Sequence, residues 1–152
     1  MAIEVGQQAP EFDLAITMQE RVTLSQFHGE KNVLLVFHPF AFTGICEAEG
    51  HELQDNLARY EEQSTEVVFV SCDTWAARQA FKAQIGAEYT FASDFWPHGA
   101  AARAYGVFNE DIGVSIRGTF LIDKDGVVQW TKVNPPPERR EGLAEESLAC
   151  LV

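Results

Sequence analysis

The sequence predicts an α/β fold, with a central mixed β-sheet flanked by helices and a β-hairpin at the N-terminus. Two apolar runs, 33–37 and 66–72, have the continuous hydrophobicity of strands buried on both faces. Each run is followed by a segment of helical periodicity, 44–61 and 74–85. Segment 115–133 contains two further strands joined by an Asp-Gly turn, which is typical of an antiparallel hairpin. This order of elements is that of a thioredoxin-like α/β sandwich.

The composition is that of a single globular domain spanning residues 1–152. A chain of 152 residues with 46% hydrophobic and 22% charged residues is long enough for one sizeable core. No run of about 18 apolar residues is present, and no basic start leads into an apolar segment, so we expect a cytoplasmic protein. The formal charge of −12 disfavours nucleic acid and anionic membranes as partners.

The remaining elements follow from local patterns. Short extended pieces at 12–14 and 22–24 flank a polar turn and predict the N-terminal hairpin, and a helical turn at 25–29 follows. Proline ends the first apolar run, and Gly86 ends the second helix. Farther along, the expected elements are a strand at 89–92, a loop at 94–99, a helix at 100–105, strands at 115–122 and 127–133, and a terminal helix at 138–151.

The most informative stretch is 39–46, between the first apolar run and the first helix. In open α/β sheets, ligand sites lie outside the carboxyl ends of central strands. If Thr43 is the helix N-cap, Cys46 occupies the third helical position. There the helix dipole lowers a thiol pKa from about 8.5 to between about 3.5 and 7.5. The Thr43 hydroxyl is then placed either to bond the thiolate or an arriving oxygen, or only to cap the helix.

Ionisation alone accelerates a thiol reaction only about tenfold, so a fast site needs further hydrogen-bond donors. Arg117 is our candidate for the positive charge, because an arginine within an apolar strand needs a partner if it is buried. The alternative is that Arg117 is a solvated charge on an edge strand. Pro39 is expected to shape the loop and shield the thiolate from water.

The cysteine pattern excludes a disulfide scaffold and argues against a dithiol reductase. The chain has three cysteines, and no two of them form a Cys-x-x-Cys pair. Cys72 ends an apolar strand and is expected to be a buried structural residue. Cys150 is either a resolving thiol or a packing residue.

A metal site or a Cys-His nucleophile is a further alternative, because His51 and Glu52 follow Cys46 closely. On a helix, however, His51 is five residues from Cys46 and therefore lies off its face. We expect neither a metal nor a cofactor.

At these residues the sequence resembles the peroxiredoxins. The signature Pro-x-x-x-Thr-x-x-Cys is present as Pro39, Thr43 and Cys46, and the arginine of Arg-Gly-Thr-Phe is Arg117. Glu49 matches a glutamate that braces this arginine in the family. The resemblance also includes Val-Gly-x-x-Ala-Pro-x-Phe at 5–12 and covers nearly the whole chain. Segments 93–99 and 104–110 are most similar to the bacterial one-cysteine AhpE-type class.

The resemblance implies a thiol-dependent peroxidase that acts as a homodimer. Cys46 would attack a hydroperoxide and become a sulfenic acid, which an external thiol or a thioredoxin- or glutaredoxin-like reductant would restore. Pro39 and Thr43 would shape the pocket, and Arg117 would stabilise the thiolate and the peroxide oxygens. A redox sensor or chaperone-like protein using the same cysteine is the alternative.

Two features near the signature have more than one interpretation. His38 stands where relatives often carry an aromatic or aliphatic residue, and it either sets pocket polarity or packs at the strand end. Four aromatic residues indicate either a pocket for organic hydroperoxides beside hydrogen peroxide or simply core packing. These are Phe40, Phe42, Phe95 and Trp96.

Overall fold

The computed structural model describes residues 2–151 and contains one large and one small sheet with helices around them. The strands of the large sheet are β1 (Asp13–Ala15), β2 (Arg21–Thr23), β3 (Asn32–Phe37), β4 (Thr65–Ser71), β5 (Thr90–Ser93), β8 (Arg117–Ile122) and β9 (Val128–Asn134). The small sheet pairs β6 (Phe108–Asn109) with β7 (Val114–Ser115). The helices are η1 (Ser25–Phe27, a 3-10 turn), α1 (Gly44–Asp55), α2 (Leu57–Glu62), α3 (Trp75–Ile85), α4 (Ala100–Ala104) and α5 (Leu143–Ala149).

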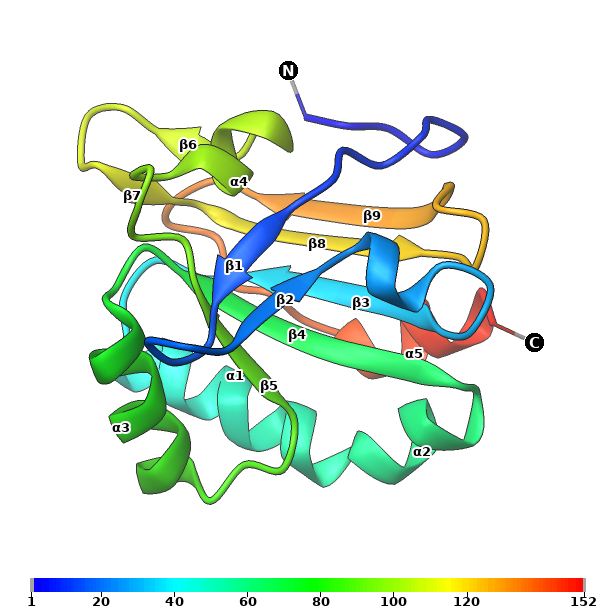
Figure 1. The fold of residues 1–152 in the computed structure, drawn as a ribbon. Helices are drawn as coiled ribbons and strands as arrows, with labels where there is room; N and C mark the ends of the chain where they lie inside the picture. The colour runs from blue at the N-terminus through cyan, green and yellow to red at the C-terminus, as the bar shows by residue number, and fades with distance from the viewer. Residues whose placement is uncertain (1, 152) are drawn as a thin grey trace.

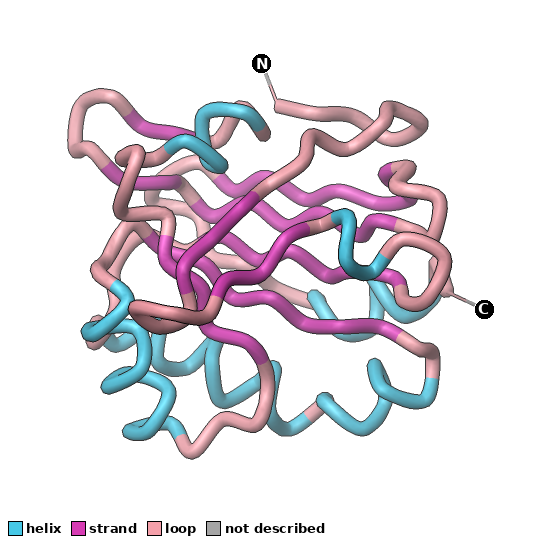
Figure 2. Tube along the Cα trace, in the orientation of Figure 1, coloured by secondary structure: helices cyan, strands magenta, loops and turns pink. Residues whose placement is uncertain are grey.

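The large sheet separates two hydrophobic clusters. Its strand order is β2-β1-β5-β4-β3-β8-β9, with β3 parallel to β4 and antiparallel to β8. Helices α1, α2, α3 and α5 contribute to the cluster on one face, whereas α4 and the N-terminal segment contribute to the other (Figure 1). Figure 2 shows the strands running through the middle of the molecule between these layers. The α/β sandwich and its N-terminal hairpin are as predicted.

Strand β3 lies inside the sheet because both of its faces are apolar. Val33, Leu35 and Phe37 pack into the cluster shared with α4, and Leu34 and Val36 pack into the cluster shared with α1. Successive side chains of a strand point to opposite faces, so a continuous apolar run supplies both clusters. The carboxyl end of β3 is therefore fixed from both sides.

No helix within residues 2–151 combines the length and the apolar character needed to cross a membrane.

The predicted helix at 44–61 is wrong in one respect, because Asn56 divides it into α1 and α2. Asn56 has φ −105° and ψ 6°, and its side-chain amide donates to the Glu52 carbonyl over 2.9 Å. Asparagine competes in this way for backbone hydrogen bonds, which apolar periodicity does not reveal.

Two predictions for the last third of the chain also need correction. The strand expected at 115–122 is interrupted at Ile116, whose N–H bonds the Val107 carbonyl over 2.8 Å instead of continuing the strand. The short strand β6 was not predicted. The terminal helix is α5 alone, because Gly142 has φ 69° immediately before it. Residues 138–141 thus lie outside the helix.

The second helix, α3, has the ends that the sequence predicts. The Thr74 hydroxyl accepts the Ala77 N–H over 3.2 Å at its start, and Gly86 follows its last residue with φ 73°. A left-handed backbone favours glycine, since a side chain there meets its own carbonyl.

We therefore expect Gly86→Ala to lower the free energy of unfolding by about 1 kcal/mol. Urea denaturation measures this change. Gly44→Ala is the matched control, because Gly44 is a helical glycine with open space around its Cβ position and no left-handed φ. Equal stability of Gly86→Ala and the wild type would contradict the role of this glycine.

Candidate active site

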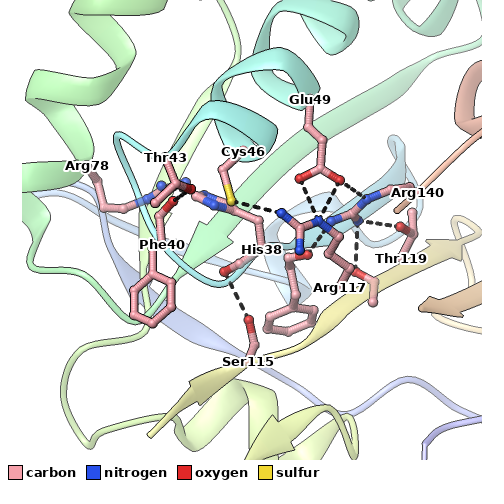
Figure 3. A network of polar contacts seen from close by, with 12 residues as sticks. His38, Phe40, Thr43, Cys46, Glu49, Arg78, Ser115, Arg117, Thr119 and Arg140 are labelled. Atoms are coloured by element: carbon pink, nitrogen blue, oxygen red, sulfur yellow. Dashed lines mark hydrogen bonds and ion pairs between the residues drawn. The ribbon is translucent and has the colours of Figure 1, made fainter. Parts of the chain in front are cut away.

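Cys46 lies at the carboxyl edge of the sheet, where the turn after β3 enters α1. It is the third residue of the helix and only 1% exposed. The Nη2 atom of Arg117 lies 3.4 Å from the Cys46 sulfur (Figure 3). Because β8 runs antiparallel to β3, with Phe37 opposite Gly118, the start of β8 meets the end of β3. This pairing brings a residue 71 positions away to the thiol.

Glu49 holds two arginines beside the thiol. Its carboxylate accepts from Arg117 Nε at 3.2 and 3.3 Å and from Arg140 Nε at 2.8 Å. Glu49 follows Cys46 by three residues and therefore shares its helix face. The Arg117 side chain is 13% exposed, and β8 lies between β3 and β9, so Arg117 is not a solvated charge on an edge strand.

Arg140 is the site residue that the sequence did not reveal. Its guanidinium is fully buried and also donates to the Phe37 carbonyl over 2.5 Å and to the Thr119 hydroxyl over 2.6 Å. Burial lowers its pKa, while Glu49 opposes that shift. The prediction of a helix from 138 concealed this residue, since an arginine in a polar, charged segment normally lies in solvent. Two guanidinium groups against one carboxylate leave a net positive charge next to the sulfur.

Thr43 is the residue before the helix, but its side chain makes no capping hydrogen bond. Its carbonyl accepts the Glu47 N–H over 2.8 Å, and its hydroxyl donates to the Phe40 carbonyl over 2.9 Å. The helix therefore begins where the sequence predicts, whereas the interpretation of Thr43 as a side-chain cap is wrong. A hydroxyl whose proton is directed at Phe40 has its lone pairs free to accept a hydrogen bond.

The turn between β3 and α1 is held by contacts on both sides of Pro39, which is half-buried. Ala41 N–H donates to the Asp73 carboxylate over 2.8 Å, and the Ser71 hydroxyl donates to the same oxygen over 2.5 Å. Phe42 adopts φ 65°, a conformation that is rare for a side chain of this size. The Asp73 carboxylate, just after β4, thus helps to hold the turn in a backbone conformation that the Phe42 side chain disfavours.

His38 is fully buried at the end of β3, and its ring stacks on Phe69 with centroids 4.1 Å apart. This is the packing role that the sequence suggested, with one addition. Arg78 of α3 reaches the ring, and its Nη1 lies 2.6 Å from His38 Nε2. Nothing in the periodicity of α3 distinguishes this arginine from a surface charge.

The four aromatic residues near the signature are not core. Their exposed fractions are 43% for Phe40, 50% for Phe42, 45% for Phe95 and 78% for Trp96. Phe42 packs against Phe81 with ring centroids 5.2 Å apart. Phe95 and Trp96 line a cavity together with Thr74 and Trp75. The alternative of simple core packing is therefore wrong for these four side chains.

All three cysteines are free thiols. Cys72 is buried just after β4, and burial raises its pKa to about 12. Cys150 is exposed at the end of α5, and its Sγ lies 3.6 Å from the Glu146 carbonyl oxygen. His51 is half-exposed and lies 3.8 Å from Glu47. Within the described residues, no three His, Cys, Asp or Glu side chains are placed to hold a metal ion.

The strand-to-helix thiol, its arginine and the sheet order together define a thiol-based redox enzyme of thioredoxin-like fold. A model of the AhpC/TSA family matches residues 5–131. Alkyl hydroperoxide reductase E of Mycobacterium tuberculosis is 41% identical over 150 residues, covering 98% of each chain. Among solved structures, reduced 2-Cys peroxiredoxin of Plasmodium vivax has a TM-score of 0.84 at 32% identity, covering 97% of this chain and 79% of that one. Peroxidoxin BcpB of Mycobacterium tuberculosis has a TM-score of 0.86 at 25% identity, covering 98% and 96%.

The chain therefore belongs to the AhpC/TSA family of peroxiredoxins, which are thiol-dependent peroxidases. The resemblance found in the sequence is confirmed, as is the thioredoxin-like fold.

The site predicts a large stability cost for neutralising Glu49. In Glu49→Gln the carboxylate charge shared by Arg117 and Arg140 is lost, and removing one partner of buried ion pairs costs about 3–5 kcal/mol. Urea denaturation at neutral pH measures this loss. Glu52→Gln on the exposed face of the same helix is the control and should change stability by less than about 0.5 kcal/mol. Similar losses of unfolding free energy in both variants would mean that the ion pairs of Glu49 do not contribute to stability.

Proposed function

We propose that this protein reduces hydrogen peroxide and organic hydroperoxides through Cys46, which becomes a sulfenic acid and is regenerated by an external thiol. The observation that carries the proposal is the contact of the Arg117 guanidinium with the Cys46 sulfur, held by the Glu49–Arg140 pair. A guanidinium fixed in this way presents donors where a peroxide oxygen arrives.

The reaction is a displacement at oxygen. The Cys46 thiolate attacks the terminal oxygen of ROOH, an S–O bond forms, and the O–O bond breaks. The terminal proton goes to the leaving oxygen, which departs as ROH, or as water from hydrogen peroxide. The sulfenate left on Cys46 takes one proton from solvent and becomes the sulfenic acid. Two external thiols then reduce the sulfenic acid, giving the Cys46 thiol, one disulfide and one water.

Thr43 and Arg117 make different contacts with the peroxide. The Thr43 hydroxyl proton is directed at Phe40, so its oxygen accepts the O–H of the peroxide. Arg117 donates to the oxygens that gain negative charge, and Pro39 limits access of water to the sulfur. Positioning the peroxide before reaction lowers the barrier, because no groups have to reorganise during bond breaking.

The cysteine environments support an external reductant. Cys72 is buried, and its raised pKa, about 12, keeps it a thiol at neutral pH and therefore a poor nucleophile. We propose that a low-molecular-weight thiol, or a thioredoxin- or glutaredoxin-like protein, restores Cys46. The exposed Cys150 is not required in this scheme.

Four further proposals concern the substrate, the oligomeric state, the domain organisation and the compartment. The exposed aromatic side chains Phe40, Phe42, Phe95 and Trp96 favour apolar hydroperoxides and, as apolar surface, also favour a homodimer. We also propose that residues 1–152 form one domain. Free thiols in an acidic protein fit a reducing cytoplasm.

The decisive experiment is intact mass spectrometry after one equivalent of hydrogen peroxide. We expect the wild type to gain one oxygen on Cys46, and Cys46→Ser to gain none and to lack peroxidase turnover with excess thiol. Cys72→Ser and Cys150→Ser should keep turnover and are the matched controls. Turnover in Cys46→Ser would refute the assignment. A disulfide from Cys46 to either other cysteine would replace the one-cysteine scheme, and a single oxidation without turnover would indicate a sensor.

Arg117→Lys should slow the oxidation of Cys46 by about tenfold or more while leaving the fold intact. An ammonium group cannot contact Glu49 and the sulfur with the fixed fork of a guanidinium. Stopped-flow measurement of the second-order rate constant with hydrogen peroxide tests this, with circular dichroism as the check on folding. A wild-type rate constant in Arg117→Lys would remove this arginine from the reaction.

A further inference from the structure

His38 and Arg78 form a buried pair next to the active-site turn, and the peroxide chemistry described above does not use it. Both side chains are 0% exposed. Arg78 Nη1 lies 2.6 Å from His38 Nε2, and the other guanidinium nitrogens donate to the carbonyls of Ala92 and Phe69 at 3.0 and 2.7 Å. Within residues 2–151 neither side chain has an ion pair with a carboxylate. A buried arginine held by an imidazole instead of an acid needs an explanation.

The contact determines the tautomer of His38. A guanidinium has only donors, so Nε2 must accept and cannot carry a proton. The neutral ring therefore carries its proton on Nδ1. Burial lowers the pKa of His38. The charged groups that face the ring are all cationic and lower this pKa further, namely Arg78 from α3, Arg140 after β9 and Arg117 from β8. The rings packed against it, those of Phe69 and Phe81, carry no charge.

The Nδ1 proton lies on the side of the active-site turn. Nδ1 has no hydrogen-bond partner among residues 2–151. Phe40, which Figure 3 shows beside the ring, carries the backbone group that opposes the lowering of the His38 pKa. The Phe40 carbonyl also accepts the hydroxyl proton of Thr43 over 2.9 Å. One carbonyl thus lies between the imidazole and the threonine that we place on the peroxide.

We propose that His38 and Arg78 are positioning residues for the peroxide site: Arg78 fixes the ring as its Nδ1–H tautomer, and the ring holds the Phe40 carbonyl that orients the Thr43 hydroxyl. The inference rests on the function proposed above and adds two residues to it. Its consequence is that the hydroxyl proton of Thr43 stays directed at Phe40, which leaves the oxygen free to accept the peroxide O–H.

The tautomer is measured without any substitution or peroxide. Long-range ¹H–¹⁵N correlation spectra of the reduced, full-length protein distinguish protonated from bare ring nitrogens, and His38→Asn assigns the His38 signals among the four histidines. We expect Nδ1–H and bare Nε2 from about pH 5.5 to 8, the range in which an ordinary imidazole titrates. A ring protonated on Nε2 at neutral pH overturns the proposal.

The positioning role is measured by the rate of Cys46 oxidation with hydrogen peroxide. Arg78→Met should be about threefold to tenfold slower, as for one lost hydrogen bond. The double variant Arg78→Met/His38→Asn should be no slower than Arg78→Met, because both residues act through the same carbonyl. Lys82→Met is the control, since it removes one cation from the same helix, and its relative rate should stay near one.

A second variant covers the case in which Arg78→Met does not fold. In His38→Gln the amide oxygen takes the place of Nε2 toward Arg78, but no donor stands at the Nδ1 position. A folded His38→Gln with slowed oxidation supports the proposal, and a wild-type rate in either folded variant overturns it. If Cys46 of the wild type is not oxidised by peroxide, the proposed function is refuted instead. The tautomer measurement uses no peroxide, so its result is independent of that outcome.

Discussion

The structure of the site depends on one carboxylate that balances two buried guanidinium groups. Glu49 accepts from Arg117 at 3.2 Å and from Arg140 at 2.8 Å, and all three side chains are largely or fully buried. Each charge taken out of water carries a desolvation cost, which only close pairing and further hydrogen bonds offset. The Phe37 carbonyl and the Thr119 hydroxyl supply such bonds to Arg140. The arrangement leaves one positive charge in excess beside the Cys46 sulfur.

The topology of the sheet makes this cluster possible. Parallel pairing of β3 with β4 and antiparallel pairing with β8 bring the ends of β3 and β4 to the same edge as the start of β8. Asn134, at the end of β9, pairs with Arg117, so the chain leaves β9 at that edge as well. The helix with the thiol, the strand with the first arginine and the segment with the second therefore meet at one place. The strand register thus brings together residues that are far apart in the sequence.

The turn that carries the thiol is held from outside itself. Asp73 bonds the Ala41 amide, and Phe42 has a φ of 65° that its own side chain does not favour. On the other side, His38 and Arg78 form a polar pair inside an aromatic cluster. A rigid turn keeps Thr43 and Cys46 in a fixed relation, and such preorganisation is what peroxide cleavage requires.

The sequence by itself determined the local parts of this protein. Apolar runs located β3 and β4, the Asp-Gly turn located the last hairpin, and the signature residues located the start of α1, because strand burial, turn geometry and helix starts depend on neighbouring residues. It also singled out Arg117 as an arginine in need of a partner, without deciding between burial and solvent. Only the tertiary structure placed Arg117 against Cys46, revealed Arg140 in the segment before the terminal helix, and paired Arg78 with His38. These contacts join residues that are 40 to 91 positions apart in the sequence. Strand register and the path of the chain decide whether charges so far apart meet, and local sequence patterns do not encode either of them.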